Sequence, residues 1–186
     1  MRLVVYSKSG EVPKWFHSHP YKDHSTIISG PSQAAAFLQY MIDQYDHPVD
    51  MVMMFLHTNS PTTMVREIGY DLVMASSSIS NNNEKSLFRW FWPIGVIGVC
   101  DHEGYPHTTG LPLKQMFEVA GIQLPPTIPF IFDQTFAIKH QTLTSIQKGV
   151  YEALLASQER FGNQWEPCIA RTWLSLYKAS NTWSSV

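Results

Sequence analysis

The feature that most constrains the fold of this chain is a strand, a helix and a second strand that follow one another near its start. Residues 2–7 form a β-branched apolar run that ends in a turn at Lys8–Gly10, which predicts a buried strand. The segment PSQAAAFLQYMIDQY, from Pro31, contains helix formers throughout and begins with a proline suited to a first turn. VDMVMMFL then supplies a continuous apolar run of strand length. This order predicts a βαβ-like unit.

The rest of the chain continues to mix predicted helices with predicted strands. We expect a helix at 60–75, a loop at 76–83, a strand at 93–100, a turn at 101–106, a short helix at 113–121, strands within 130–143, and helices at 146–160 and 167–179. The expected fold is therefore α/β or α+β, a single domain over 1–186 with a mixed β-sheet flanked by helices and two C-terminal helices.

The last of these helices has one apolar face and several charged positions. Ile169, Trp173 and Leu176 recur at helical spacing and are expected in the core. Glu166, Arg171 and Lys178 are expected to form its solvated face.

Composition narrows the classes of function. A net charge of −2 argues against a partner such as a long nucleic acid, although a small anionic ligand remains compatible with it. No apolar run approaches the roughly 20 residues needed to cross a bilayer, so no membrane partner is expected. The two cysteines show no disulfide or zinc spacing, and no signal-like run opens the chain, so we expect a cytoplasmic protein. Only 15% of residues are charged, which is compatible with a surface covered in a homo-oligomer or a larger assembly.

Three short triplets could carry chemistry. In a strand, residues i and i+2 face the same side, so a His and a Thr with one residue between them present an imidazole and a hydroxyl together. The triplets are His24-Ser25-Thr26, His107-Thr108-Thr109 and His140-Gln141-Thr142. On neighbouring strands, two of them would surround one phosphate, with one imidazole as base and the other as acid. Taken singly, each is also typical of a half-buried strand or turn.

The triplets and their setting resemble the two-histidine (LigT-like) phosphoesterase family. MRLVVY is similar to the opening strand of that family, DHSTIIS to its first motif, and LKQMFEVAG with IQLPPTIPF and KHQTLTS to its approach to the second motif. The resemblance covers about half the chain and implies catalysis by His24 and Thr26 with His140 and Thr142. The interval from His24 to His140 is longer than in the family, whereas His107 with Thr109 stands at a more typical distance, so the second histidine remains open.

The stretch WFHSHPYKDHS supports a competing interpretation. His17 and His19 would project from one side of a strand, and Asp23 with His24 could complete a zinc site. WFHSHP is also similar to the HSHP segment of JAMM metalloproteases. Candidate distal ligands are His57, Asp101, His102 and His107.

These patterns support three hypotheses of function. The first is a metal-independent phosphoesterase, with no cofactor, that acts on a small nucleotide-like phosphodiester. The second is a non-catalytic structural or interaction subunit of a larger assembly. The third is a zinc-dependent hydrolase that uses His17, His19 and Asp23.

Overall fold

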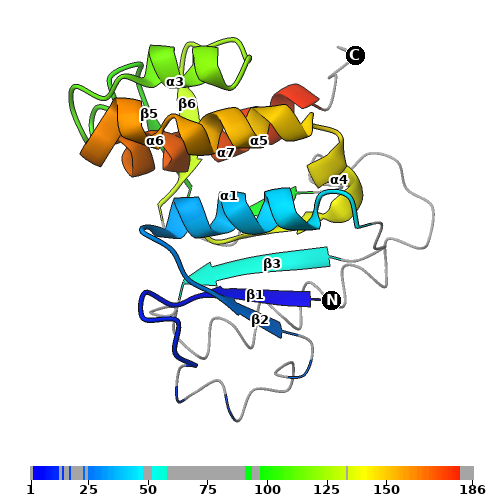
Figure 1. The fold of residues 1–186 in the computed structure, drawn as a ribbon. Helices are drawn as coiled ribbons and strands as arrows, with labels where there is room; N and C mark the ends of the chain where they lie inside the picture. The colour runs from blue at the N-terminus through cyan, green and yellow to red at the C-terminus, as the bar shows by residue number, and fades with distance from the viewer. Residues whose placement is uncertain are drawn as a thin grey trace.

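The computed structural model describes residues 2–12, 14, 17, 23, 25–47, 52–57, 91–93, 97–132 and 134–180. Within them, a mixed sheet has the strand order β2-β1-β3-β7-β4 (Figure 1). Its strands are β1 (Arg2–Tyr6), β2 (Ser25–Ile28), β3 (Val52–His57), β4 (Phe91–Pro93) and β7 (Phe136–Lys139). The central strand of the parallel part, β1, pairs with both β2 and β3. β7 is antiparallel to β3 and β4, which makes the sheet mixed, as predicted.

Helix α1 (Gln33–Gln44) connects β2 to β3 and confirms the predicted βαβ-like unit. The Ser32 side chain caps it, because its Oγ accepts a hydrogen bond from the Ala35 backbone N–H at 3.2 Å. Its apolar residues pack on the sheet, where the Phe37 ring lies 4.9 Å from the Phe55 ring. The helix is buried on more than one side, because the five consecutive residues 34–38 are all buried.

The remaining helices form a layer on the other side of α1 (Figure 1). They are α3 (Leu113–Val119), α4 (His140–Thr144), α5 (Lys148–Ala156), α6 (Gln158–Phe161) and α7 (Trp165–Ser180). The indole N–H of Trp165 donates to the Leu154 carbonyl and to the Ser157 hydroxyl, both at 2.9 Å, and so joins the start of α7 to the end of α5. Helix α1 lies between the sheet and α5 (Figure 1), whereas α7 also contacts the sheet directly, since the Trp173 ring lies 5.3 Å from the Phe136 ring of β7.

A second, two-stranded sheet packs against α7. β5 (Ile97–Cys100) and β6 (Ile128–Ile131) are antiparallel, with Gly98 opposite Phe130. A Cβ on Gly98 would stand 2.7 Å from the Phe132 ring and 2.8 Å from the Phe130 ring. Glycine at this position therefore allows both rings to cover the strand.

One hydrophobic core joins these layers. It extends from Val4 in β1 through Phe37 and Phe136 to Tyr177 in α7. Because residues from both ends of the described chain share this core, the fold is an α/β single domain with a mixed sheet and flanking helices.

Two predicted elements, the helix at 60–75 and the loop at 76–83, fall outside the described residues. The predicted strand, turn and short helix between residues 93 and 121 are represented by β5, the turn after it and α3. None of the helices in the described part of the chain has the length and hydrophobicity of a membrane span.

Candidate functional site

The first predicted triplet enters the sheet at its edge strand. His24 lies outside the described residues, but β2 begins at the next residue, Ser25. Thr26 is half-buried in β2 and pairs with Val4 of β1. The threonine of this triplet therefore lies on a strand, as predicted.

The prediction that the third triplet lies on a strand is wrong. β7 ends at Lys139 and α4 begins at His140, so His140 and Thr142 occupy the first turn of a helix. Residues i and i+2 of a helix point to different sides, because each residue turns the chain by about 100°. Thr142 is buried, and Nε2 of the half-buried His140 lies 3.1 Å from the Gln44 carbonyl at the end of α1. The His140 imidazole therefore contacts the end of α1, and Thr142 points to a different side of α4.

The first and third triplets are also not on neighbouring strands. β1 and β3 separate β2 from β7 in the sheet, so β2 and β7 are three strand spacings, or roughly 14 Å, apart. The first and third motifs therefore do not lie on adjacent strands, contrary to the prediction. The residues next to these motifs, Ser25 and Lys139, lie at the same end of the sheet.

The second triplet lies in the turn after β5 and is not on a strand. His107 and Thr109 are exposed, and Thr108 is half-buried. The His107 ring packs edge-on against Phe132 at 4.8 Å and Phe130 at 5.3 Å between centroids. His107 is thus exposed to solvent, while its ring packs against two aromatic side chains.

The turn that holds His107 is built by its own backbone and by Asp101. The Asp101 carboxylate accepts hydrogen bonds from the Glu103 and Tyr105 N–H groups, both at 2.9 Å, and these hydrogen bonds lower the pKa of Asp101. The N–H groups of His107 and Thr108 both donate to the Gly104 carbonyl, at 3.1 and 2.9 Å. Asp101 therefore acts in these contacts as a turn-forming residue.

Beneath this turn lies Arg171, which was expected on a solvated face of α7 and instead is only 6% exposed. Its Nη2 donates to the Thr108 hydroxyl at 3.0 Å, its Nη1 donates to the Pro167 carbonyl at 2.8 Å, and its guanidinium carbon lies 4.6 Å from the centre of the Phe130 ring. Sequence periodicity missed it because nearly every side of α7 is buried, not one face.

The Arg171 charge has no carboxylate partner in the described part of the chain, where the ion pair is the one between Lys148 and Asp46. Its Nε is buried and makes no hydrogen bond. A buried cation without a counter-ion is costly, and it projects positive potential onto the surface above it. The turn carrying His107 therefore lies over a positive charge.

The thiols of Cys100, at the end of β5, and Cys168, in α7, are both buried. Burial raises the pKa of Cys100, an effect that Arg171 partly offsets, and burial raises the pKa of Cys168 to about 12. Both thiols are therefore protonated near neutral pH and are not candidate nucleophiles.

The predicted metal ligands do not assemble among the residues that the structure describes. His17 and Asp23 are exposed, and His19 lies outside the described residues. Of the candidate distal ligands, Asp101 and His107 make the contacts given above, and Nε2 of His102 lies 3.0 Å from the Pro125 carbonyl. Within the described ranges, no three His, Cys, Asp or Glu side chains form a group suited to a metal ion.

The chain has no match among protein-family models, curated proteins or solved structures.

Proposed function

We propose that this chain binds a small nucleotide-like phosphodiester at the turn after β5 and cleaves it by imidazole acid/base chemistry, with His107 as one proton-transfer residue. The observation that supports this proposal is an exposed imidazole on a turn whose next residue, Thr108, is held by a buried guanidinium without an ion-pair partner among the described residues. A phosphate bound at Thr108 would be attracted by the guanidinium that holds this hydroxyl.

Each side chain at the turn has a distinct role in the proposal. The Thr108 Oγ1 accepts a hydrogen bond from Arg171, so its own O–H remains available to donate to a phosphate oxygen. Arg171 is a positioning residue, because it holds Thr108 and adds positive charge without reaching the surface. Thr109 offers a second exposed hydroxyl. His107 exchanges a proton with the reacting oxygen.

The reaction needs both a base and an acid. One imidazole removes a proton from the attacking water, whose oxygen bonds to phosphorus. The ester P–O bond then breaks, and a second, protonated group delivers a proton to the leaving oxygen. The resemblance to the phosphoesterase motif implies His24 as this second group; it precedes β2, in the five-stranded sheet, whereas His107 follows β5, in the two-stranded sheet.

The proposal is tested by hydrolysis of bis(4-nitrophenyl) phosphate in the presence of EDTA. We expect His107→Ala to lower kcat/KM by about 100-fold or more, because general acid/base groups contribute on this order. His102→Ala is the matched control, since His102 lies in the same turn but contacts the Pro125 carbonyl, and it should retain nearly full activity. An unaltered rate in His107→Ala, or a wild-type rate equal to the uncatalysed one, would reject the proposal.

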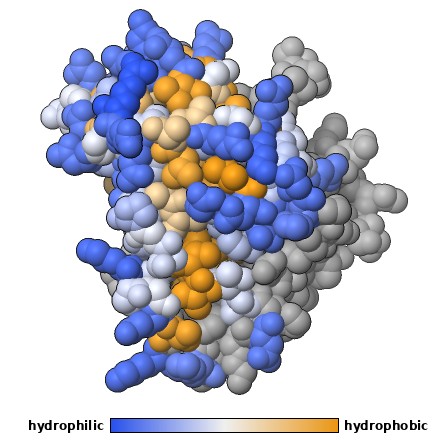
Figure 2. All heavy atoms as spheres, in the orientation of Figure 1, coloured by the Kyte–Doolittle hydropathy of each residue, from blue (hydrophilic) through white to orange (hydrophobic). Residues whose placement is uncertain are grey.

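A second candidate function, an interaction subunit of a larger assembly, is favoured by apolar side chains at the surface near β5. Large hydrophobic residues exposed there are Ile97 (49%), Val99 (52%), Tyr105 (62%) and Phe132 (45%). Figure 2 shows a further apolar band that crosses the visible face from the helices to the sheet. Contiguous apolar surface of this kind is typical of protein interaction sites.

A subunit of a larger assembly should form a native particle that is heavier than one chain. If it holds, light scattering of the purified chain at micromolar concentration should give a multiple of the chain mass, and Val99→Ser should lower that value by weakening the association. A monomer at all concentrations, with no co-purifying partner, would count against it.

A further inference from the structure

The two-stranded sheet leaves one edge of β5 unpaired within the described part of the chain. β6 is the strand that pairs with β5 there, and it places Pro129 opposite Val99. Proline has no N–H, so Val99 and Pro129 cannot exchange the two hydrogen bonds of a hydrogen-bonded pair. The backbone groups of Gly98 and Cys100 therefore face β6. Those of Ile97 and Val99, which alternate with them, point away from β6.

This outer edge of β5 carries neither a charge nor a proline. The strand reads Ile-Gly-Val-Cys, and the side chains of Ile97 and Val99 are 49% and 52% exposed. Among the backbone hydrogen bonds of the described residues, none outside the two-stranded sheet involves Ile97 or Val99. Edge strands are normally protected from pairing with another chain by lysine, proline, a bulge or a covering segment. β5 therefore has the features of a strand that accepts a further strand.

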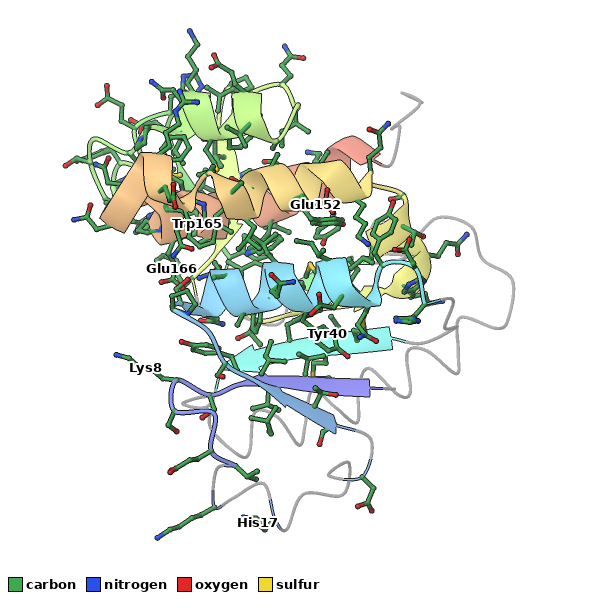
Figure 3. All side chains as sticks on the ribbon, in the orientation of Figure 1. Lys8, His17, Tyr40, Glu152, Trp165 and Glu166 are labelled. Carbon is green, nitrogen blue, oxygen red and sulfur yellow. The ribbon has the colours of Figure 1, made fainter. Side chains whose placement is uncertain are left out.

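The outer strand β2 of the five-stranded sheet differs from β5. It carries the hydroxyl side chains of Ser25 and Thr26, and all of its residues are half-buried. Figure 3 shows His17 beyond β2, on the opposite side of the five-stranded sheet from Trp165, whereas β5 and β6 lie with the helical layer (Figure 1). Of these two edge strands, β5 is the one along which large apolar side chains are exposed.

A second copy of this chain fits the outer edge of β5, because the strand is complementary to itself. If two β5 strands pair antiparallel around a two-fold axis at Gly98, Ile97 of each copy lies opposite Val99 of the other. The outward N–H and C=O groups of both residues are then satisfied. The β-branched side chains of Ile97 and Val99 from both copies form one apolar stripe, and glycine at the axis leaves room for close approach.

The small area of this edge limits how tightly two copies bind. A standard interface buries roughly 800 Å² on each partner, more than a strand of four residues provides. Phe132 adds to it, because its ring covers Gly98, where a Cβ would lie 2.7 Å from the ring, and it is 45% exposed. We therefore expect a reversible dimer that forms at micromolar concentration.

We propose that β5 is an association surface of this chain and that its partner is the β5 strand of a second copy, so that the two-stranded sheets of both copies join into one sheet across a two-fold axis. Such an interface uses the same surface on both copies, so assembly through it stops at the dimer. The proposal rests on the assembly function, for which it names the partner, and does not depend on the phosphodiester site.

Light scattering after size-exclusion chromatography, over a series of concentrations, tests this pairing with two double variants. Ile97→Lys with Val99→Lys places ammonium groups opposite one another across the axis, so we expect a monomer where the wild type is a dimer. Ile97→Lys with Val99→Glu is the matched control, because it places an ammonium group opposite a carboxylate and should keep the dimer. Both change the same two exposed positions, and circular dichroism should show the same fold in each.

Val99→Pro tests the backbone without adding a charge. It removes an outward N–H and no hydrogen bond to β6, so it should weaken the dimer by about tenfold or more while the chain stays folded. A wild-type chain that is monomeric throughout the series, or loss of the dimer in both double variants, would overturn the β5 pairing. A heavier particle that the variant with two lysines retains would also overturn it, but would leave the assembly function in place.

Discussion

Replacing Phe136 with alanine is expected to lower the free energy of unfolding by about 3–5 kcal/mol, the range measured for large aromatic residues in well-packed cores. Phe136 is fully buried in β7, between β3 and β4. Its ring lies 5.1 Å from Phe55 and 5.3 Å from Trp173, so it joins the sheet to α7. Truncation removes these contacts and leaves a cavity that neither layer can fill without shifting.

Urea denaturation followed by tryptophan fluorescence measures this loss. Phe132→Ala is the matched control, because Phe132 follows β6 and is 45% exposed, and it should cost less than about 1 kcal/mol. This loss is a large part of a total stability of about 5–15 kcal/mol, so Phe136→Leu provides a milder variant with an intermediate loss. Equal stability of the Phe136 and Phe132 alanine variants would contradict the central position of Phe136.

The elements that the sequence predicted well are those with strong local patterns. Helix α1 combines helix formers, a capping serine and apolar residues at helical spacing, and it begins and ends close to the predicted residues. β3 is a continuous apolar run, and α3 lies within its predicted range. In each case, the local preference and the tertiary environment favour the same structure, so the pattern alone is sufficient.

The elements that were mispredicted depend on contacts between distant residues. The Phe, Ile and Thr content of residues 130–143 predicts strands, yet the chain changes from β7 to α4 at His140. There, Nε2 of His140 lies at the end of α1, and the Tyr151 hydroxyl donates to the Leu143 carbonyl at 3.0 Å. The predicted helix at 146–160 is likewise divided after α5 at Ser157, whose hydroxyl accepts a hydrogen bond from the indole N–H of Trp165 in α7. Gln44 and Trp165 both lie outside the elements whose ends they contact.

The candidate site was likewise predicted only where its residues are close in sequence. The sequence identified His107, its threonines and the turn that holds them, because these residues are adjacent. It missed Arg171, which lies 63 residues from Thr108 in the chain. It also missed that Glu166, which was expected on a solvated face of α7, accepts a hydrogen bond from the Ala34 N–H, 132 residues away. Strand order and helix placement bring these groups together, and neither follows from the spacing of residues.

Alkaline pH is expected to destabilise this fold steeply, because three buried acidic groups hold their protons in the folded chain. The Tyr151 hydroxyl donates to the Leu143 carbonyl and lies 3.3 Å from the Tyr177 hydroxyl. Burial raises the pKa of both tyrosines above their usual value, and burial also raises the pKa of Cys168 to about 12. The unfolded chain releases these protons from pH 9.0 for the cysteine and from pH 10.0 for the tyrosines.

The sign of the effect follows from proton linkage. Above these pH values, the folded state binds more protons than the unfolded state, so stability falls as pH rises, by about 1.4 kcal/mol per pH unit for each group, until the pKa of the folded state is reached. Below pH 9, the same groups are protonated in both states and contribute no pH dependence. Urea denaturation at pH 8, 9, 10 and 11 measures this slope.

Tyr177→Phe removes one of the three groups and should reduce the slope above pH 10 by about 1.4 kcal/mol per pH unit, whatever it does to stability at pH 8. Tyr105→Phe, at a position that is 62% exposed, should leave the slope of the wild type unchanged. Lysine deprotonation affects all these chains alike, so the difference between the slopes isolates the buried phenol. Equal slopes in the two variants would mean that Tyr177 is not held neutral between the sheet and the helices, and the packing of α7 described above would then be wrong at its centre.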